Sequence, residues 1–163
     1  MRSIEPIDCR DPRVLVAVGF GSGFAARAPG TAGSIAALAI WWMCIAPLAA
    51  VLQVAVIGVA TVLGIYCVAS TCRVTGVGDD SRIVVDEWLG TWIALIAAPR
   101  HWAPAAIAFG AFRLFDIWKP WPIGWIDRRV GGGLGIVLDD LIAGGLALAV
   151  LQLSIAAWRL GAA

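Results

Sequence analysis

The feature that most constrains this chain is a stretch of 45 residues, 28–72, without a charged side chain. A membrane-spanning helix needs about 20 apolar residues, so the stretch is long enough for two helices. Pro47 lies near its middle, where a proline interrupts a helix. The chain is 61% hydrophobic and 14% charged, with a mean hydropathy of +0.89, whereas soluble domains are about 45–50% apolar and 25% charged. These values exclude a soluble domain, and the net charge of +1 argues against a nucleic-acid-binding protein.

Five apolar segments predict an all-α integral membrane bundle, because none of them alternates apolar and polar residues as a half-buried strand does. We expect about five transmembrane helices, the first of which is short enough either to span the membrane or to re-enter it. The length of 163 residues predicts a single membrane-embedded domain with an N-terminal tail over residues 1–12. The expected helices cover residues 34–46, 48–70, 83–98, 104–118 and 136–158.

The positive charges are divided unevenly between the two sides on which these helices would end. Alternate threading of five helices places ten of the 12 Lys and Arg residues on one side, and only Arg100 and Arg159 on the other. Cytoplasmic loops of membrane proteins carry the excess of Lys and Arg. The sequence therefore predicts a cytoplasmic N-terminus, and the same threading places all 11 acidic residues on the cytoplasmic side.

Five acidic residues lie about one turn inside three different helix ends at one membrane depth: Asp86, Glu87, Asp116, Asp139 and Asp140. Ionisable groups within membrane spans are costly and generally face a bundle interior or a water-filled cavity. One interpretation is that these acids form structural ion pairs with Arg and Lys residues at the interface. Their convergence from three helices favours the other interpretation, a cation site with an electropositive rim.

The ligand type and the neighbouring residues favour magnesium and a phosphate-bearing substrate. Carboxylate oxygens select Mg²⁺ or Ca²⁺ over Zn²⁺, and Mg²⁺ binds through a few carboxylates together with substrate phosphate oxygens. Thr31 and Ser34 lie in a Gly-rich helix entry, which can present hydroxyl and backbone N–H groups to an anion. Arg113 and Lys119 add positive charge three residues on either side of Asp116.

Two glycines, Gly90 and Gly144, follow Asp86 and Asp140 by one helical turn. Small residues let helices in a membrane approach one another closely. The sequence therefore predicts that the two acid-bearing helices pack together tightly enough to share a metal ion.

Three long motifs occur in order along the chain: GFGSGFAARAPGTAGS at residues 19–34, IVVDEWLGTW at 83–92, and FRLFDIWKPWPIGWIDRRVGGGLGIVLDDLIAGG at 112–145. Together they closely resemble the phosphatidylglycerophosphatase A family. The resemblance implies a Mg²⁺-dependent enzyme that removes the terminal phosphate of phosphatidylglycerophosphate, completing phosphatidylglycerol synthesis at the bacterial inner membrane. It also implies a helical bundle in which a central helix is surrounded by the others.

The resemblance and the residue chemistry together suggest a role for each candidate. We expect one or two Mg²⁺ ions on Asp86, Glu87, Asp139 and Asp140, with Asp116 as a further ligand or as the general base. The nucleophile is either a water molecule or an Asp carboxylate, and the catalytic candidates are Asp86, Asp116, Asp139 and Asp140. The expected substrate-binding residues are Thr31, Ser34, Arg113 and Lys119 and, from the family pattern, Asp80 and Asp127.

Two other classes of protein are compatible with parts of this pattern. An ion- or proton-conducting membrane protein would use the same carboxylates, but no acidic residue continues toward the opposite side. A lipid-binding subunit without chemistry would explain a predicted interfacial belt of tryptophans, but not the acids. We expect a phospholipid in the bilayer as the partner, and no obligate protein partner. The predicted belt consists of Trp88, Trp92, Trp118, Trp121 and Trp125.

Overall fold

The computed structural model describes residues 9–76 and 80–161, and these residues form helices and loops without a strand. The all-helical prediction is therefore confirmed for this part of the chain. Most of the predicted N-terminal tail, residues 1–8, lies outside the described residues. In chain order the elements are α1 (Pro12–Ala17), the 3₁₀-helix η1 (Gly19–Phe24), α2 (Pro29–Ile40), the π-helix η2 (Trp41–Ile45), α3 (Ala50–Thr75), α4 (Val85–Ala94), α5 (Trp102–Trp118), α6 (Ile123–Arg129) and α7 (Gly132–Gly161).

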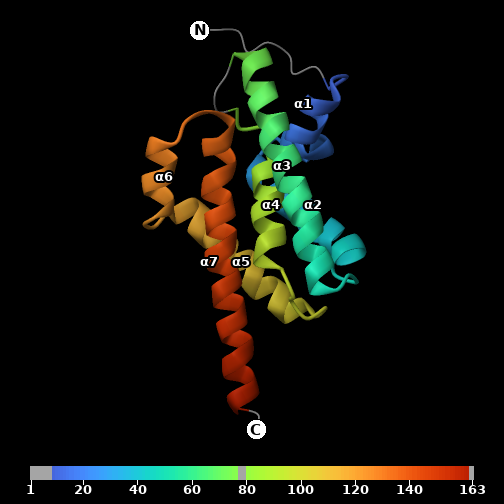
Figure 1. Cartoon of the computed structure of the whole chain (residues 1–163), viewed down its shortest axis with the longest axis vertical. Helices are drawn as coiled ribbons and strands as arrows, with labels where there is room; N and C mark the ends of the chain where they lie inside the picture. Colours follow the sequence, from blue (N-terminus) through green and yellow to red (C-terminus); the bar gives the residue numbers. More distant parts are fainter. Residues whose placement is uncertain (1–8, 77–79, 162–163) are drawn as a thin grey trace.

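The short helix α4 is the central helix of the bundle (Figure 1). It packs most extensively against α7, and it also contacts α2, α3 and α5. Seven of its ten residues are buried, including Asp86 in its first turn. The central-helix arrangement that the family resemblance implied is therefore present in the structure.

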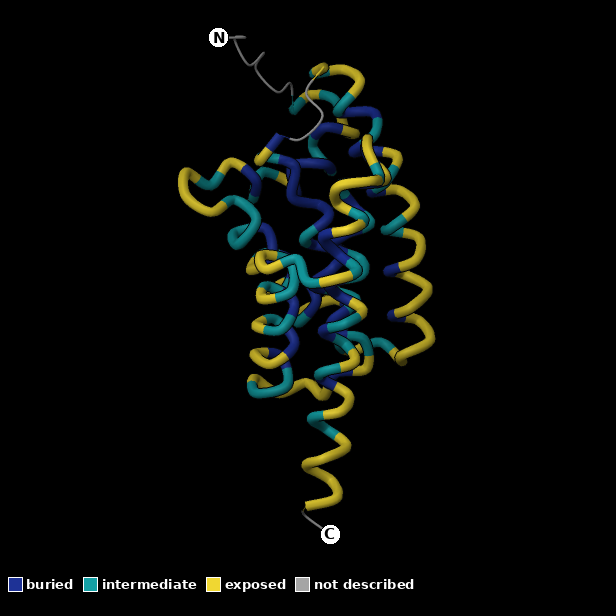
Figure 2. The backbone as a smooth tube through the Cα atoms, turned by 90° about the vertical axis from the view of Figure 1, so that its left-hand side faces the viewer, coloured by how far each residue is buried: buried dark blue, intermediate teal, exposed yellow. Residues whose placement is uncertain are grey.

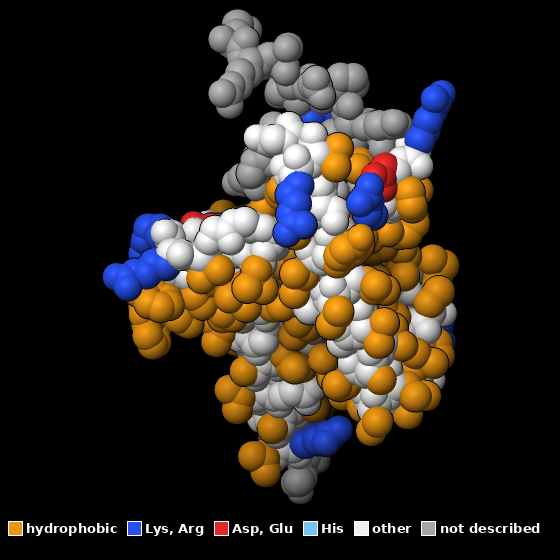
Figure 3. All heavy atoms as spheres, turned by 45° about the horizontal axis from the view of Figure 1, so that its top comes forward, with side chains coloured by type: hydrophobic (Ala, Val, Ile, Leu, Met, Phe, Trp, Pro, Cys, Tyr) orange, Lys and Arg blue, Asp and Glu red, His pale blue; other side chains and the backbone are white. Residues whose placement is uncertain are grey.

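Two helices are long and apolar enough to cross a membrane, α3 with 26 residues and α7 with 30, which correspond to about 39 and 45 Å. The membrane-facing character of these helices is supported by their exposed apolar side chains, such as Val51, Val59 and Val62 of α3. Figure 2 shows that the C-terminal part of α7 is exposed, and Figure 3 shows apolar side chains below the charged end. A core helix of a soluble protein would be covered instead, so this exposure favours contact with lipid.

Five spanning helices were expected, but within the described ranges only α3 and α7 are long enough to cross a membrane. The expected helix over residues 83–98 is too long: α4 has 10 residues, about 15 Å. The chain turns after Ala94, and Ala97 has a left-handed φ of 56° before Pro99. The number of spanning helices and the cytoplasmic N-terminus stay predictions.

Other helix boundaries also differ from the predicted ones. The first expected helix begins at Pro29 rather than at residue 34, because Ala28 has a left-handed φ of 48° and Pro29 then occupies the first helical turn. Three further elements, α1, η1 and α6, have only six or seven residues each. Such short helices contain too few turns to produce a recognisable apolar period.

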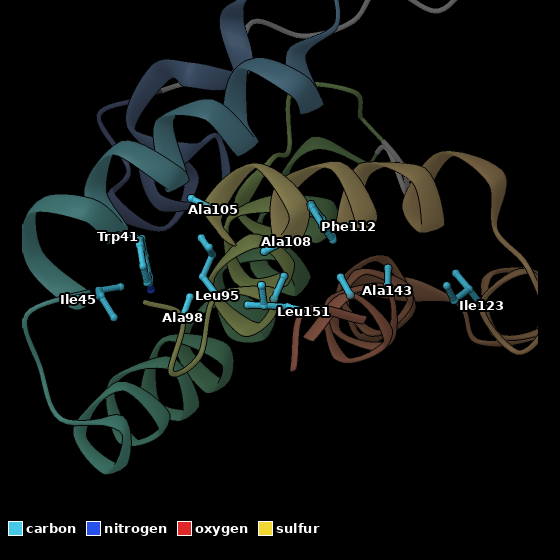
Figure 4. Close-up of a cluster of buried hydrophobic side chains, with 12 residues drawn as sticks. Trp41, Ile45, Leu95, Ala98, Ala105, Ala108, Phe112, Ile123, Ala143 and Leu151 are labelled. Atoms are coloured by element: carbon cyan, nitrogen blue, oxygen red, sulfur yellow. The ribbon is translucent and has the colours of Figure 1, made fainter. Parts of the chain in front are cut away.

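A cluster of buried side chains joins η2, α4, α5 and α7 (Figure 4). Several of its members are alanines, which allow the helix backbones to approach closely. Its largest members include Trp41 of η2 and Phe112 of α5, both fully buried. Because α4, α5 and α7 also carry the candidate acids, this cluster fixes the relative positions of those acids.

Candidate active site

A cavity of about 550 Å³ opens at the end of the bundle that carries the acids. The start of α2, the first turn of α4, the end of α5, α6 and the first turns of α7 all contribute to its wall. The structure therefore brings most of the predicted site residues into one cavity, while Thr31, Ser34 and Asp80 are not among its lining residues. The predicted residues in the lining are Asp86, Glu87, Arg113, Asp116, Lys119, Asp127, Asp139 and Asp140.

Asp86, Glu87 and Asp140 form the tightest group of acids in this cavity. One carboxylate oxygen from each residue lies within 4.8 Å of those of the other two. Asp86 and Glu87 come from the first turn of α4, and Asp140 comes from α7. Carboxylates this close repel one another unless protons or a cation lie between them. Their oxygen atoms are the ligands that a hard divalent cation prefers.

Glu87 lies directly against the start of α2 because position 30 is a glycine. A Cβ atom at Gly30 would lie 2.1 Å from Glu87 Oε1, so a larger residue there would displace the carboxylate. The other carboxylate oxygen, Oε2, is buried and has no hydrogen-bond partner in the described part of the chain. A buried acceptor without a partner is costly, and coordination to a cation would satisfy it. The donor set of these acids therefore fits Mg²⁺.

The guanidinium of Arg113 contacts one carboxylate and two hydroxyl groups. Its Nη1 lies 2.7 Å from Asp116 Oδ2. Nη1 and Nη2 donate to Ser34 Oγ and Thr31 Oγ1, both at 3.3 Å. Thr31 and Ser34 do not line the cavity, and their hydroxyl groups orient Arg113; their predicted role in binding the substrate stays a prediction.

Lys119 joins two of the acids in the cavity. It ends α5 in a left-handed conformation, with a φ of 48°, and its Nζ donates to Asp127 Oδ1 at 2.6 Å and to Asp139 Oδ2 at 2.7 Å. Asp139 and Asp140 are adjacent in sequence, yet only Asp140 belongs to the group of three carboxylates. The two neighbours therefore have different surroundings. Asp139 contacts the ammonium group of Lys119, whereas Asp140 lies beside other carboxylates.

Asp80 is paired with Arg82 in the loop that leads into α4. Its carboxylate accepts hydrogen bonds from the Arg82 side chain and from the Arg82 backbone N–H, and its carbonyl oxygen accepts one from Ile83 N–H at 2.8 Å. Asp80 was predicted to bind the substrate, but its carboxylate stabilises this loop and does not line the cavity.

The hydrogen bonds from the Arg82 side chain hold the pKa of Asp80 below its ordinary value of 3.8. The ionised carboxylate therefore stabilises the folded state above pH 3.8, and this contribution is lost as the pH falls through the lower folded-state pKa. We expect Asp80→Asn to lower the Tm at pH 7 by about 2–4 °C, with the difference disappearing in acid. Thermal unfolding of the detergent-solubilised proteins, followed by circular dichroism, would measure the Tm at pH 7 and in acid.

The matched control for this prediction is Asp11→Asn. Asp11 pairs with Arg13 at the same sequence separation, but that ion pair is exposed and exposed pairs contribute little to stability. Equal Tm values for Asp80→Asn and Asp11→Asn at pH 7 would contradict the role given to Asp80.

The predicted belt of tryptophans divides into two groups in the structure. Trp88 is buried, so the prediction is wrong for this residue. Trp92 is half-buried, and its Nε1 donates to the carbonyl oxygen of Ala37 at 2.9 Å. Trp118, Trp121 and Trp125 are exposed near the cavity. Sequence reasoning missed Ser81, which lines the cavity but belongs to no motif with a chemical signature.

Comparison with known proteins gives the class to which this helical protein belongs. The family model described as phosphatidylglycerophosphatase A matches residues 15–155. The phosphatidylglycerophosphatase A of Escherichia coli (strain K12) is 42% identical over 153 residues, which cover 93% of this chain and 88% of that protein. The protein of the same name from Haemophilus influenzae is 38% identical over 141 residues, 86% of each chain. The chain is thus a phosphatase, a phosphoric monoester hydrolase.

A third relative, from Bacteroides thetaiotaomicron, is 38% identical over 156 residues, 91% of this chain and 95% of that protein. It is provisionally named as a phosphatidylinositol-3-phosphatase. No solved structure gives a significant match. The family match and the identities over most of the chain show that this protein belongs to the phosphatidylglycerophosphatase A family.

Proposed function

We propose that this chain hydrolyses the terminal phosphate of phosphatidylglycerophosphate in a Mg²⁺-dependent reaction, giving phosphatidylglycerol and inorganic phosphate. The observation that carries the proposal is the group of three carboxylates, Asp86, Glu87 and Asp140, in one cavity with Arg113 and Lys119. Such a site combines ligands for a divalent cation with positive side chains for phosphate oxygens. The two named phosphatidylglycerophosphatases among the relatives support the choice of lipid.

The proposed Mg²⁺ ligands are Asp86, Glu87 and Asp140. Bound there, Mg²⁺ supplies positive charge that neutralises the carboxylates and polarises the phosphoryl group. Asp139 was predicted as a fourth ligand, but its 2.7 Å contact with Lys119 Nζ favours a different role. We assign Asp139 to the orientation of Lys119.

The remaining polar side chains of the cavity would bind the phosphate and move the proton. Arg113 and Lys119 would donate charge-assisted hydrogen bonds to the phosphate oxygens, as Arg and Lys side chains do in other phosphate-binding sites. Asp116, oriented by Arg113 at 2.7 Å, would accept a proton from the attacking water. The oxygen of this water would then bond to phosphorus and the ester P–O bond would break. The leaving glycerol oxygen would take up the proton that Asp116 accepted, which returns Asp116 to its carboxylate form.

The position of the cavity suits a lipid substrate. It opens at the end of a bundle whose long helices α3 and α7 expose apolar side chains, so a headgroup can enter while the acyl chains stay in the bilayer. Figure 3 shows that most of the Lys and Arg side chains visible in that view lie at this end. Given the excess of Lys and Arg there, we propose that the site faces the cytoplasm at the bacterial inner membrane.

The test is phosphate release from phosphatidylglycerophosphate in detergent micelles, with Mg²⁺ and then with EDTA. We expect release that requires Mg²⁺ and that EDTA reduces to background. Phosphatidylinositol 3-phosphate, the lipid in the name of the Bacteroides relative, serves as the comparison substrate and should be hydrolysed more slowly. Absence of release from the folded protein with Mg²⁺ would contradict the proposal and favour the ion-conducting alternative.

A further inference from the structure

A second cavity, of about 450 Å³, lies between the start of α5 and the C-terminal part of α7. It is well separated from the carboxylates, because Asp140 and Ile155 of α7 are 15 residues apart, about 22 Å along a helix. Its walls are apolar and include Pro104, Ile107, Leu151 and Ile155. Its size falls in the range of small-molecule sites, and its position places it at the opposite end of the bundle.

The rim of this second cavity is cationic. Arg159 and His101 line it, and Arg159 is exposed, with no ion pair to any described acid. No acidic residue occurs between residues 88 and 115 or after Asp140, so no acidic side chain of these segments neutralises Arg159 or Arg100, which precedes His101. The rim therefore attracts an anion.

His101 can contribute a hydrogen bond to such an anion. Its Nδ1 accepts the backbone N–H of Ala103 at 3.3 Å, which caps the start of α5. In a neutral imidazole whose Nδ1 accepts, Nε2 carries the proton and is a donor. The rim thus offers the Nε2–H of His101 and the guanidinium of Arg159, a group whose planar donors match phosphate oxygens.

We propose that this cavity binds one anionic phospholipid from the leaflet opposite the carboxylate cavity. The lipid phosphate contacts Arg159 and His101, and one acyl chain lies along Ile107, Ile155 and the neighbouring apolar wall. Trp158, at 80% exposure, precedes Arg159 and also lines the cavity, and exposed tryptophan side chains favour the headgroup region of a membrane. The inference is independent of the phosphatase reaction, since it involves none of the acids.

A second copy of the chain fits this surface less well than a lipid does. Two copies joined here would bring together two sets of Arg100 and Arg159 side chains without an acidic partner on either side, and like charges repel. An anionic headgroup instead supplies the missing negative charge.

The test is native mass spectrometry of the purified protein with phosphatidylserine and phosphatidylethanolamine of identical acyl chains. Both headgroups carry the phosphate, but the ammonium of phosphatidylethanolamine offsets its charge, whereas phosphatidylserine keeps a net negative charge that attracts Arg159. We therefore expect the wild type to retain phosphatidylserine about tenfold better, the factor that one charge-assisted contact contributes, and Arg159→Gln to lose this preference. Arg73→Gln removes the same charge from an exposed residue at the other end and should keep the preference. Ile107→Trp fills the apolar wall and should reduce retention of both lipids.

Three outcomes would overturn the proposal. The first is an unchanged phosphatidylserine preference in Arg159→Gln. The second is loss of the bound lipid in Asp140→Asn but not in Arg159→Gln, which would place the lipid in the carboxylate cavity. The third is a dimer that Ile107→Trp disrupts, which would show that a second copy occupies this surface. None of these readouts uses phosphatase activity, so they stand apart from the test of the proposed function.

Discussion

Asp140→Asn is expected to lower the rate of phosphate release about 10²–10³-fold while leaving the fold intact. Asparagine has nearly the same shape as aspartate but lacks its charge, so the group of Asp86, Glu87 and Asp140 loses one of its three negative ligands. A divalent cation bound by few carboxylates depends strongly on each of them. The measurement is the rate of Mg²⁺-dependent phosphate release at saturating lipid.

In contrast to its lower activity, the thermal stability of Asp140→Asn in EDTA should not fall. In EDTA the three carboxylates have no cation between them, and removing one charge relieves their repulsion. We therefore expect the Tm of the variant in EDTA to equal or exceed that of the wild type. Mg²⁺ should raise the Tm of the wild type, because a ligand that binds only the folded state stabilises it, and should do so much less in the variant.

Asp139→Asn is the matched control, since it makes the same chemical change one residue earlier. Asp139 contacts Lys119 rather than the other carboxylates, so the variant should keep the Mg²⁺-induced rise in Tm. Its activity should fall about 10–100-fold, the range for residues that orient a functional group. Identical losses of activity and of the Mg²⁺ effect in both variants would contradict the separate roles of the two residues.

The difference between Asp139 and Asp140 could not be predicted from the sequence. The sequence correctly indicated that acids from α4, α5 and α7 converge, because helix ends on one side of a bundle lie at one depth. Neighbouring residues on a helix, however, point about 100° apart. Whether Asp139 or Asp140 points toward Lys119 depends on the left-handed conformation at the end of α5. This conformation is unusual for a non-glycine residue.

Other differences between the predicted and the observed structure arise where two possible local structures have the same apolar composition. Residues 83–98 are apolar both in α4 and in the turn that follows it, so hydropathy predicted one long helix in place of a short one. Trp88 and Trp92 have the composition of an interfacial belt, but α4 is central and buries Trp88. The roles of Thr31 and Ser34 likewise depended on Arg113, which is about 80 residues away in the sequence.

The close approach of α4 and α7 was predicted from Gly90 and Gly144, and the structure confirms it. A Cβ atom at Gly144 would lie 2.5 Å from the carbonyl oxygen of Gly90 and 3.0 Å from its Cα. These are backbone atoms, so they can move only if the helices separate. Because α4 carries Asp86 and α7 carries Asp140, any such separation also opens the group of carboxylates.

Gly144→Ala is therefore expected to lower both activity and stability, although alanine is the better helix former by about 1 kcal/mol. Overpacking a tight contact costs about 1–3 kcal/mol, which outweighs that gain. A displacement of reacting groups by about 1 Å can reduce a rate 10²-fold, so we expect at least a tenfold loss of phosphate release. Thermal unfolding and the activity assay would be measured on the same preparation.

Gly145→Ala provides the control, because it makes the same substitution one residue further along α7. Position 145 is exposed, and a Cβ atom there would meet nothing within 4 Å. This variant has the helix-propensity gain without the packing cost, so its Tm should equal or exceed that of the wild type, with full activity. If both alanine variants behaved alike, contact between the two helices at Gly90 would not determine the spacing of the carboxylates. A loss in Gly144→Ala alone would show that this backbone contact sets the geometry of the proposed metal site.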